Sequence, residues 1–91
     1  MKKRGHFVIQ GRVQGVCFRM YACEEAQAHR LGGWVRNRPD GTVEVVVEGD
    51  EAAVESFRQW CRQGPAQAKV TEVLTSYSEA RGDLTSFEIR F

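Results

Sequence analysis

The chain has 91 residues, a hydrophobic share of 42%, a charged share of 27% and a formal net charge of +1. These values are typical of a globular domain and exclude a disordered or membrane-spanning chain. The net charge is too small for the strongly basic surface that usually binds nucleic acid or acidic membranes, so any anion site must be local. We therefore expect a single domain over residues 1–91 that acts as a monomer, without nucleic-acid or membrane partners.

The three cysteines are odd in number and lie within regular apolar patterns, which argues against a disulfide framework. We expect reduced thiols and a cytoplasmic location. Residues 1–4 are basic but precede no apolar segment of signal-peptide length, so we interpret them as a solvated tail.

Residues 6–13 alternate in polarity, with Phe7, Ile9, Gly11 and Val13 on one face, and this pattern predicts a first strand. Residues 18–31 change to helical spacing. Their apolar side is expected to comprise Phe18, Ala22 and Ala26, extended by Tyr21, Ala28 and Leu31. The pair Gly32–Gly33 is predicted to end this helix, because glycine readily adopts a positive φ.

Two further strands are expected at 34–38 and 43–48, joined by a type I turn with proline in its second position and glycine in its fourth. Asp50 is predicted to cap a second helix that ends at Gly64–Pro65. Its buried row is expected to be Val54, Phe57 and Cys61. The last two strands are predicted at residues 70–77, which are rich in β-forming residues, and at residues 86–91, which alternate in polarity.

This order, βαββαβ followed by a terminal strand, predicts an α+β fold with an antiparallel sheet of four to five strands and two helices on one face. The first strand, helix and second strand form a crossover, so the two strands run parallel and end at the same edge of the sheet. We therefore expect the loop after Val13 to lie near Asn37, although the two are far apart in the sequence.

The segment Gly11–Arg19 runs from a strand through a turn into a helix, an arrangement that points successive backbone N–H groups at an anion. Arg19 is unexpected in the first helical turn, because a cation there opposes the helix dipole by about 0.3–1 kcal/mol. A bound anion would reverse that sign, and a guanidinium offers paired donors suited to phosphate oxygens. On the residues alone, an ordinary turn with a solvated arginine stays open as an alternative.

The sequence contains two ungapped motifs and two weaker ones, which together cover nearly the whole chain. The first motif is Gly11-x-Val13-Gln14-Gly15-Val16-x-Phe18-Arg19. The second is Gly33-Trp34-Val35-x-Asn37-x-x-Asp40-Gly41-x-Val43. The weaker ones are Gly64-Pro65-x-x-Ala68-x-Val70 and Phe87-x-Ile89-Arg90-Phe91. In their order and spacing, these motifs resemble those of the acylphosphatase family.

The resemblance implies a ferredoxin-like sandwich that hydrolyses the carboxyl–phosphate bond of an acyl phosphate to a carboxylate and inorganic phosphate, without metal, cofactor or covalent intermediate. It implies that Asn37 orients the attacking water. The phosphoryl oxygens would be held by Arg19 and the backbone amides of Gln14, Gly15, Val16, Cys17 and Phe18. General chemistry agrees, because a carboxylate is a good leaving group, and positioning with charge stabilisation can carry phosphoryl transfer.

Other reactive side chains are assigned structural roles. Only Phe18 separates Cys17 from Arg19, which is too close for a nucleophile at the base of a phosphate cradle. His6 and His29 lie away from the expected site and are interpreted as solvated or hydrogen-bonded histidines. No group of His, Cys, Asp and Glu has the spacing of metal ligands, so no metal is expected.

The remaining arginines and aromatic residues near the motifs give less specific evidence of function. Arg12, Arg36 and Arg38 either raise the positive potential near the phosphate or face solvent, and the sequence leaves both possibilities open. The resemblance places Arg90 near the terminal strand, and a supporting structural role is preferred to a catalytic one. Core packing is the preferred interpretation of Trp34, Phe57 and Trp60.

Two other functions stay open. The same fold plan serves non-catalytic RNA-recognition and small-molecule-binding modules, although the predicted central strands carry few exposed aromatic residues for RNA. The chain could also be the acylphosphatase-like domain of a larger carbamoyl-phosphate-handling maturation protein. Met1 and the closing strand at Phe91 favour a complete chain over this second alternative.

Overall fold

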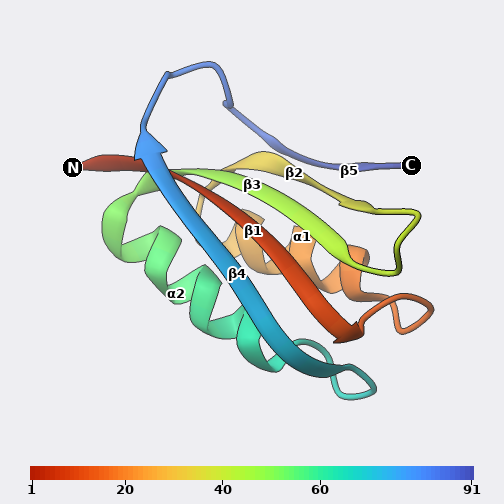
Figure 1. The fold of residues 1–91 in the computed structure, drawn as a ribbon. Coiled ribbons are helices and arrows are strands. Elements are labelled where there is room, and N and C mark those ends of the chain that lie inside the picture. Colours follow the sequence, from red (N-terminus) through yellow and green to blue (C-terminus); the bar gives the residue numbers. More distant parts are fainter.

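The structure is a computed structural model that describes residues 1–91, and it contains a five-stranded sheet and two helices (Figure 1). In chain order, the elements are β1 (Lys2–Arg12), α1 (Phe18–Ala28), β2 (Gly32–Asn37), β3 (Val43–Asp50), α2 (Glu51–Gln63), β4 (Lys69–Glu79) and β5 (Phe87–Arg90). No helix is long and apolar enough to span a lipid bilayer.

The strands are arranged in the order β4-β1-β3-β2-β5, and both helices lie on one face of the sheet (Figure 1). This confirms the expected α+β sandwich. The pairs β1–β4, β1–β3 and β2–β3 are antiparallel, as predicted, but β5 pairs parallel to β2, so the sheet is mixed. The difference arises because residues 80–86 carry the chain from one edge of the sheet to the other and reverse its direction.

The core lies between the sheet and the helices and follows the predicted periodicities. In β1 the side chains of Phe7 and Ile9 are fully buried. The buried helical rows are Phe18, Ala22 and Ala26 in α1 and Val54, Phe57 and Cys61 in α2. Tyr21 and Ala28, which were expected on the buried side of α1, are exposed.

The second helix begins and ends where the sequence predicts. The Asp50 side chain accepts a hydrogen bond from the Ala52 backbone N–H at 3.3 Å, which satisfies one of the free donors at the helix start. Gly64 follows the last turn with a φ of 70°, a conformation that glycine adopts without steric cost.

The first helix ends earlier than predicted, at Ala28, and the residue with positive φ that ends it is Arg30 and not the predicted glycine pair. Arg30 has a φ of 58°, and the Leu31 N–H donates to the Ala26 carbonyl at 2.9 Å, which closes α1 as glycine usually does. Gly32 and Gly33 instead belong to β2. A Cβ at Gly33 would clash with the carbonyl oxygen of Val46, so this glycine permits close pairing with β3.

The basic start of the chain is part of the sheet. Lys2, Lys3 and Arg4 pair with residues 48–50 of β3, so the prediction of a solvated tail is wrong. Backbone pairing in a strand leaves alternate side chains free to reach solvent or a partner. A run of charged residues can therefore form an ordered strand.

The expected meeting of the first loop with Asn37 is confirmed by the strand register. Val43, the first residue of β3, pairs with Ile9 of β1 on one side and with Asn37 of β2 on the other. The ends of β1 and β2 therefore lie at the same edge of the sheet. The β2–β3 turn at this edge is closed by a hydrogen bond from the Gly41 N–H to the Arg38 carbonyl at 3.1 Å.

Candidate active site

The loop between β1 and α1 has an unusual backbone. Gly15 has a φ of 74°, and Cys17, the N-cap of α1, has a φ of 62° and a ψ of 27°. A left-handed conformation at a residue other than glycine costs about 1–3 kcal/mol and is maintained only where the surrounding structure requires it. The loop therefore holds a defined and strained path at the start of the helix.

The backbone N–H groups of this loop have no acceptors within the protein. None of the N–H groups from Gln14 to Met20 donates to a backbone or side-chain acceptor, and the first bond of the helix runs from Tyr21 to the Cys17 carbonyl at 3.2 Å. Free N–H groups at a helix N-terminus carry partial positive charge. The loop therefore has the chemistry of an anion-binding site.

Arg19 adds a full positive charge beside these donors. Its Nη1 donates to the Arg90 carbonyl at 3.2 Å, and its guanidinium lies 4.7 Å from the centre of the Phe91 ring. No carboxylate pairs with Arg19 in the structure. The C-terminal residues therefore support the guanidinium without neutralising its charge.

Asn37 lies at the end of β2, and its side chain has no hydrogen-bond partner in the protein. It lines a cavity of about 520 Å³ together with Arg19 and residues of the loop. The full lining is Val13, Gly15, Cys17, Phe18, Arg19, Met20, Asn37, Ile89 and Phe91. The structure thus brings Gly15, Cys17, Phe18, Arg19 and Asn37 of the predicted site around one cavity.

The side chains of the other two predicted residues point elsewhere. Val16 is only 6% exposed and packs into the core. The Gln14 amide Nε2 donates to the carbonyls of Arg38 and Thr42, at 2.8 and 2.9 Å. Sequence reasoning missed this contact, and only the backbone N–H groups of Gln14 and Val16 are available to the site.

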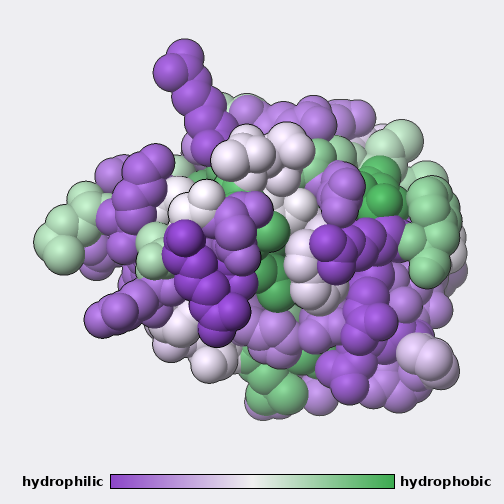
Figure 2. Space-filling view, turned by 90° about the horizontal axis from the view of Figure 1, so that it is seen from above, coloured by the Kyte–Doolittle hydropathy of each residue, from purple (hydrophilic) through white to green (hydrophobic).

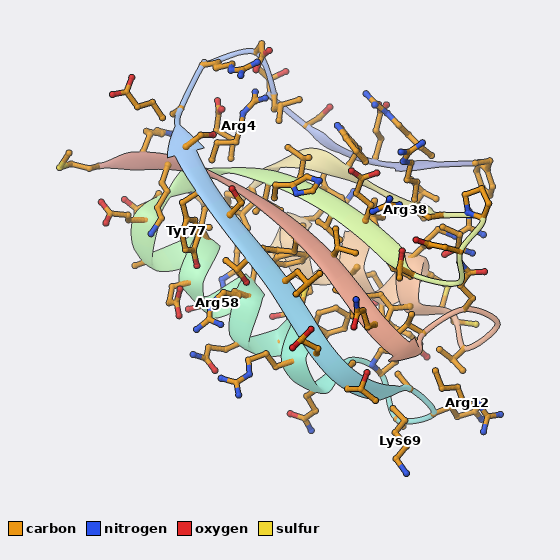
Figure 3. All side chains as sticks on the ribbon, viewed as in Figure 1. Arg4, Arg12, Arg38, Arg58, Lys69 and Tyr77 are labelled. Atoms are coloured by element: carbon orange, nitrogen blue, oxygen red, sulfur yellow. The ribbon has the colours of Figure 1, made fainter.

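Three of the four arginines near the motifs have partners of their own. The Arg36 Nε donates to Glu44 at 2.6 Å, and Arg38 lies 3.9 Å from Asp40. The Arg90 guanidinium lies 4.7 Å from the Trp34 ring centre. Arg12 has no carboxylate partner, and its side chain lies at the end of β1 beside the loop (Figure 3).

The face of the sheet opposite the helices is mostly hydrophilic (Figure 2). Glu44 on this face binds both Arg36 and His6, whose Nε2 lies 2.7 Å from the carboxylate. Burial raises the pKa of Glu44, but these hydrogen bonds outweigh it and the net pKa is lowered. Trp34 lies against Arg36 and Arg90, so it does not provide a free stacking platform for nucleic-acid bases.

The cysteines and the second histidine have structural surroundings. All three cysteines are free thiols, and burial raises the pKa of Cys61. Cys17 is exposed at the loop. His29 binds Glu25 at 3.0 Å, one turn earlier in α1. No group of three or more His, Cys, Asp or Glu side chains is placed to hold a metal ion.

Comparisons with known proteins find relatives that match over nearly the whole chain. A family model described as Acylphosphatase matches residues 5–89. The acylphosphatase of Moorella thermoacetica is 54% identical over 87 residues, which are 96% of this chain and 92% of that protein. The crystal structure of acylphosphatase from Bacillus subtilis matches with a TM-score of 0.94 and 37% identity, covering 98% of this chain and 99% of that chain.

A larger protein contains a similar region. Full-length HypF in its phosphate- and nucleotide-bound form matches with a TM-score of 0.90 and 27% identity, covering 100% of this chain but 12% of that chain. The family model and the relatives that match over nearly their full length identify the group to which the chain belongs. The chain is a member of the acylphosphatase family, a family of hydrolases.

Proposed function

We propose that this chain hydrolyses acyl phosphates to a carboxylate and inorganic phosphate. The observation that carries the proposal is the run of free N–H groups from Gln14 to Met20, which meets Arg19 and the unpaired amide of Asn37 at one edge of the sheet. The name of the relatives, acylphosphatase, supports this substrate class.

The phosphoryl group binds to Arg19 and to the backbone amides of residues 14–18. These donors are neutralised by no protein carboxylate, so a phosphate with two negative charges offsets both the helix dipole and the guanidinium. The forked guanidinium donates to two oxygens and fixes the orientation of the phosphorus atom. In this proposal the positive charge that metal ions often supply in phosphoryl transfer comes from Arg19 and the amides.

Asn37 positions the attacking water. Its amide is neutral and has no protein partner, so it can bind water without repelling the phosphate. The water oxygen attacks phosphorus, the bond from phosphorus to the acyl oxygen breaks, and the electron pair leaves with the carboxylate. The water proton passes to solvent, and no general acid is required because the carboxylate is a stable leaving group.

The acyl group occupies the remainder of the cavity. Apart from Arg19 and Asn37, the larger side chains that line the cavity are apolar, and they include Met20, Ile89 and Phe91. One chain supplies the loop, Arg19 and Asn37, so the proposed reaction needs no residue from a second copy, and we propose that the enzyme acts as a monomer. Residues 1–91 share one hydrophobic core, which supports a single acylphosphatase-like domain, and the free thiols suit a reducing cytoplasm.

The test is release of phosphate from benzoyl phosphate, with chelator present to remove metal ions. Arg19→Ala should abolish both turnover and inhibition by inorganic phosphate, whereas Asn37→Ala should lose turnover and retain that inhibition. Arg62→Ala, an exposed arginine of α2 without an ion partner, is the matched control and should behave as the wild type. Absence of hydrolysis by the folded wild type would show the proposal to be wrong.

A further inference from the structure

The side chain of Gln14 bridges the two segments that form the candidate site. It begins in the loop after β1 and reaches the turn between β2 and β3, where its Nε2 donates to the Arg38 and Thr42 carbonyls at 2.8 and 2.9 Å. Both protons of the amide are therefore used. The remaining side-chain oxygen is an acceptor and cannot bind a phosphate oxygen.

The turn that receives these bonds is held together by hydrogen bonds of its own. The Arg38 N–H donates to the Thr42 carbonyl at 2.8 Å, so the two ends of the turn are joined directly. Asp40 accepts from the Thr42 N–H at 3.1 Å and from its hydroxyl at 2.6 Å. Gln14 thus attaches to a turn with several internal hydrogen bonds, and Asn37 is the residue that immediately precedes this turn.

Arg19 is held from another direction. Its guanidinium bonds to the Arg90 carbonyl of β5, on the far side of β2 from β3. The side chain of Gln14 makes the hydrogen bonds that join loop residues 14–17 to the turn after Asn37. The strand pairing brings the loop and Asn37 to the same edge of the sheet, and this amide adds the side-chain link that holds the loop against the turn.

We propose that Gln14 is a positioning residue that fixes Asn37, and the water it binds, relative to the phosphate held by the loop. The inference rests on the proposed function. Attack in line with the leaving group tolerates little displacement, since a shift of about 1 Å in a reacting group can cost about 100-fold in rate. The backbone N–H of Gln14 binds the phosphate, and its side chain holds the loop in position relative to Asn37.

The first test is Gln14→Met, which preserves the length of the side chain and the backbone N–H but removes both donors. We expect kcat for benzoyl phosphate to fall by about 10- to 100-fold, because the water is no longer held in line. The inhibition constant of inorganic phosphate should change by less than about threefold, because the cradle is intact. Gln63→Met, at the exposed end of α2, is the matched control and should leave both constants unchanged.

A double-mutant cycle distinguishes an effect of Gln14 that acts through Asn37 from a loss of activity that is independent of Asn37. If Gln14 acts through Asn37, Gln14→Met should reduce kcat by less than about threefold when it is added to Asn37→Ala. A full further loss in the double variant would contradict the inference. So would a folded Gln14→Met enzyme with wild-type kcat, or one in which kcat and phosphate affinity fall together.

Gln14→Glu provides a second readout in case the methionine variant does not fold. The ionised carboxylate would face two carbonyl oxygens, but its protonated form can donate one hydrogen bond. We expect its kcat, relative to the wild type, to rise as the pH is lowered from about 7 to about 5, toward the ordinary pKa of a glutamate. A pH-independent ratio would contradict the inference, whereas failure of the wild type to hydrolyse benzoyl phosphate would contradict the proposed function itself.

Discussion

The guanidinium of Arg19 donates to the main-chain carbonyl of Arg90, with 3.2 Å between Nη1 and the oxygen. The acceptor belongs to β5, the last strand and an edge of the sheet. A carbonyl orients the guanidinium but does not cancel its charge, as a carboxylate would. One nitrogen of Arg19 is thus engaged, and the others are free for an anion.

Arg19→Lys tests whether charge alone is sufficient. Lysine keeps the positive charge but loses the planar fork, so its three donors diverge from one nitrogen and cannot offer a parallel pair to two phosphate oxygens. We expect kcat/KM for benzoyl phosphate to fall by about 100-fold or more, equivalent to about 3 kcal/mol of transition-state binding. Steady-state kinetics and circular dichroism on the same sample will check this. A lysine variant within threefold of the wild type would contradict the role of the fork.

The meeting of the loop with Asn37 could be predicted from sequence, because it follows from topology. A strand-helix-strand crossover makes β1 and β2 parallel, and this holds whatever the side chains are. The core rows of α1 and α2 were also predictable, since their period is that of the helix itself. These features depend on local pattern and on general rules of chain connection.

Other features depend on contacts between distant residues and could not be predicted. Nothing near Gln14 in the sequence indicates that its amide bonds to the turn at 38–42. The positive φ values of Cys17 and Arg30 are likewise unexpected, because glycines stand close by in the sequence. In both places a residue other than glycine adopts a positive φ, so residue preference does not predict the backbone conformation.

Asn37→Asp tests whether the amide must be neutral. The change is isosteric but places a negative charge on the lining of the cavity that also contains Arg19. We expect turnover to fall by about 100-fold and the affinity for inorganic phosphate to fall as well, because the carboxylate repels the anion and pairs with Arg19. Phosphate inhibition measured beside Asn37→Ala distinguishes charge from lost water binding. Equal phosphate affinity in the two variants would contradict this account.

Cys17→Gly tests whether the thiol takes part in the reaction. Glycine removes the sulfur and also accepts the φ of 62° without steric strain. We expect kcat within about threefold of the wild type and a free energy of unfolding that is unchanged or higher by up to about 1 kcal/mol. Urea unfolding and phosphate release are the measurements. Cys17→Ser is the control, because serine also lacks the thiol but, like cysteine, has a Cβ that is strained at this φ. A loss of turnover beyond 100-fold in both variants would point to a covalent role for the thiol.

Glu48→Gln tests the anchor of the segment that leads to β5. Glu48 is 6% exposed, and its carboxylate accepts hydrogen bonds from the Arg81 and Gly82 N–H groups at 2.9 and 2.7 Å and from Arg4 at 3.0 Å. Burial raises its pKa, but these bonds outweigh burial and the net pKa is lowered. Replacing the charge should reduce the free energy of unfolding at neutral pH by about 2–4 kcal/mol, because the two N–H groups lose their ionic acceptor and Arg4 is left with Asp83 as its one carboxylate partner.

The pH dependence of that loss follows from the sign of the shift. A carboxylate whose pKa is lower in the folded state stabilises the fold at pH values above its unfolded pKa, and this contribution disappears as the pH falls through the folded pKa. The wild type should therefore exceed Glu48→Gln in stability at about pH 7 and approach it at about pH 3. Urea unfolding of both proteins across this range will measure the difference. A gap that stays constant with pH would mean that Glu48 acts through packing, and that its charge does not hold the segment that carries β5 to Arg19.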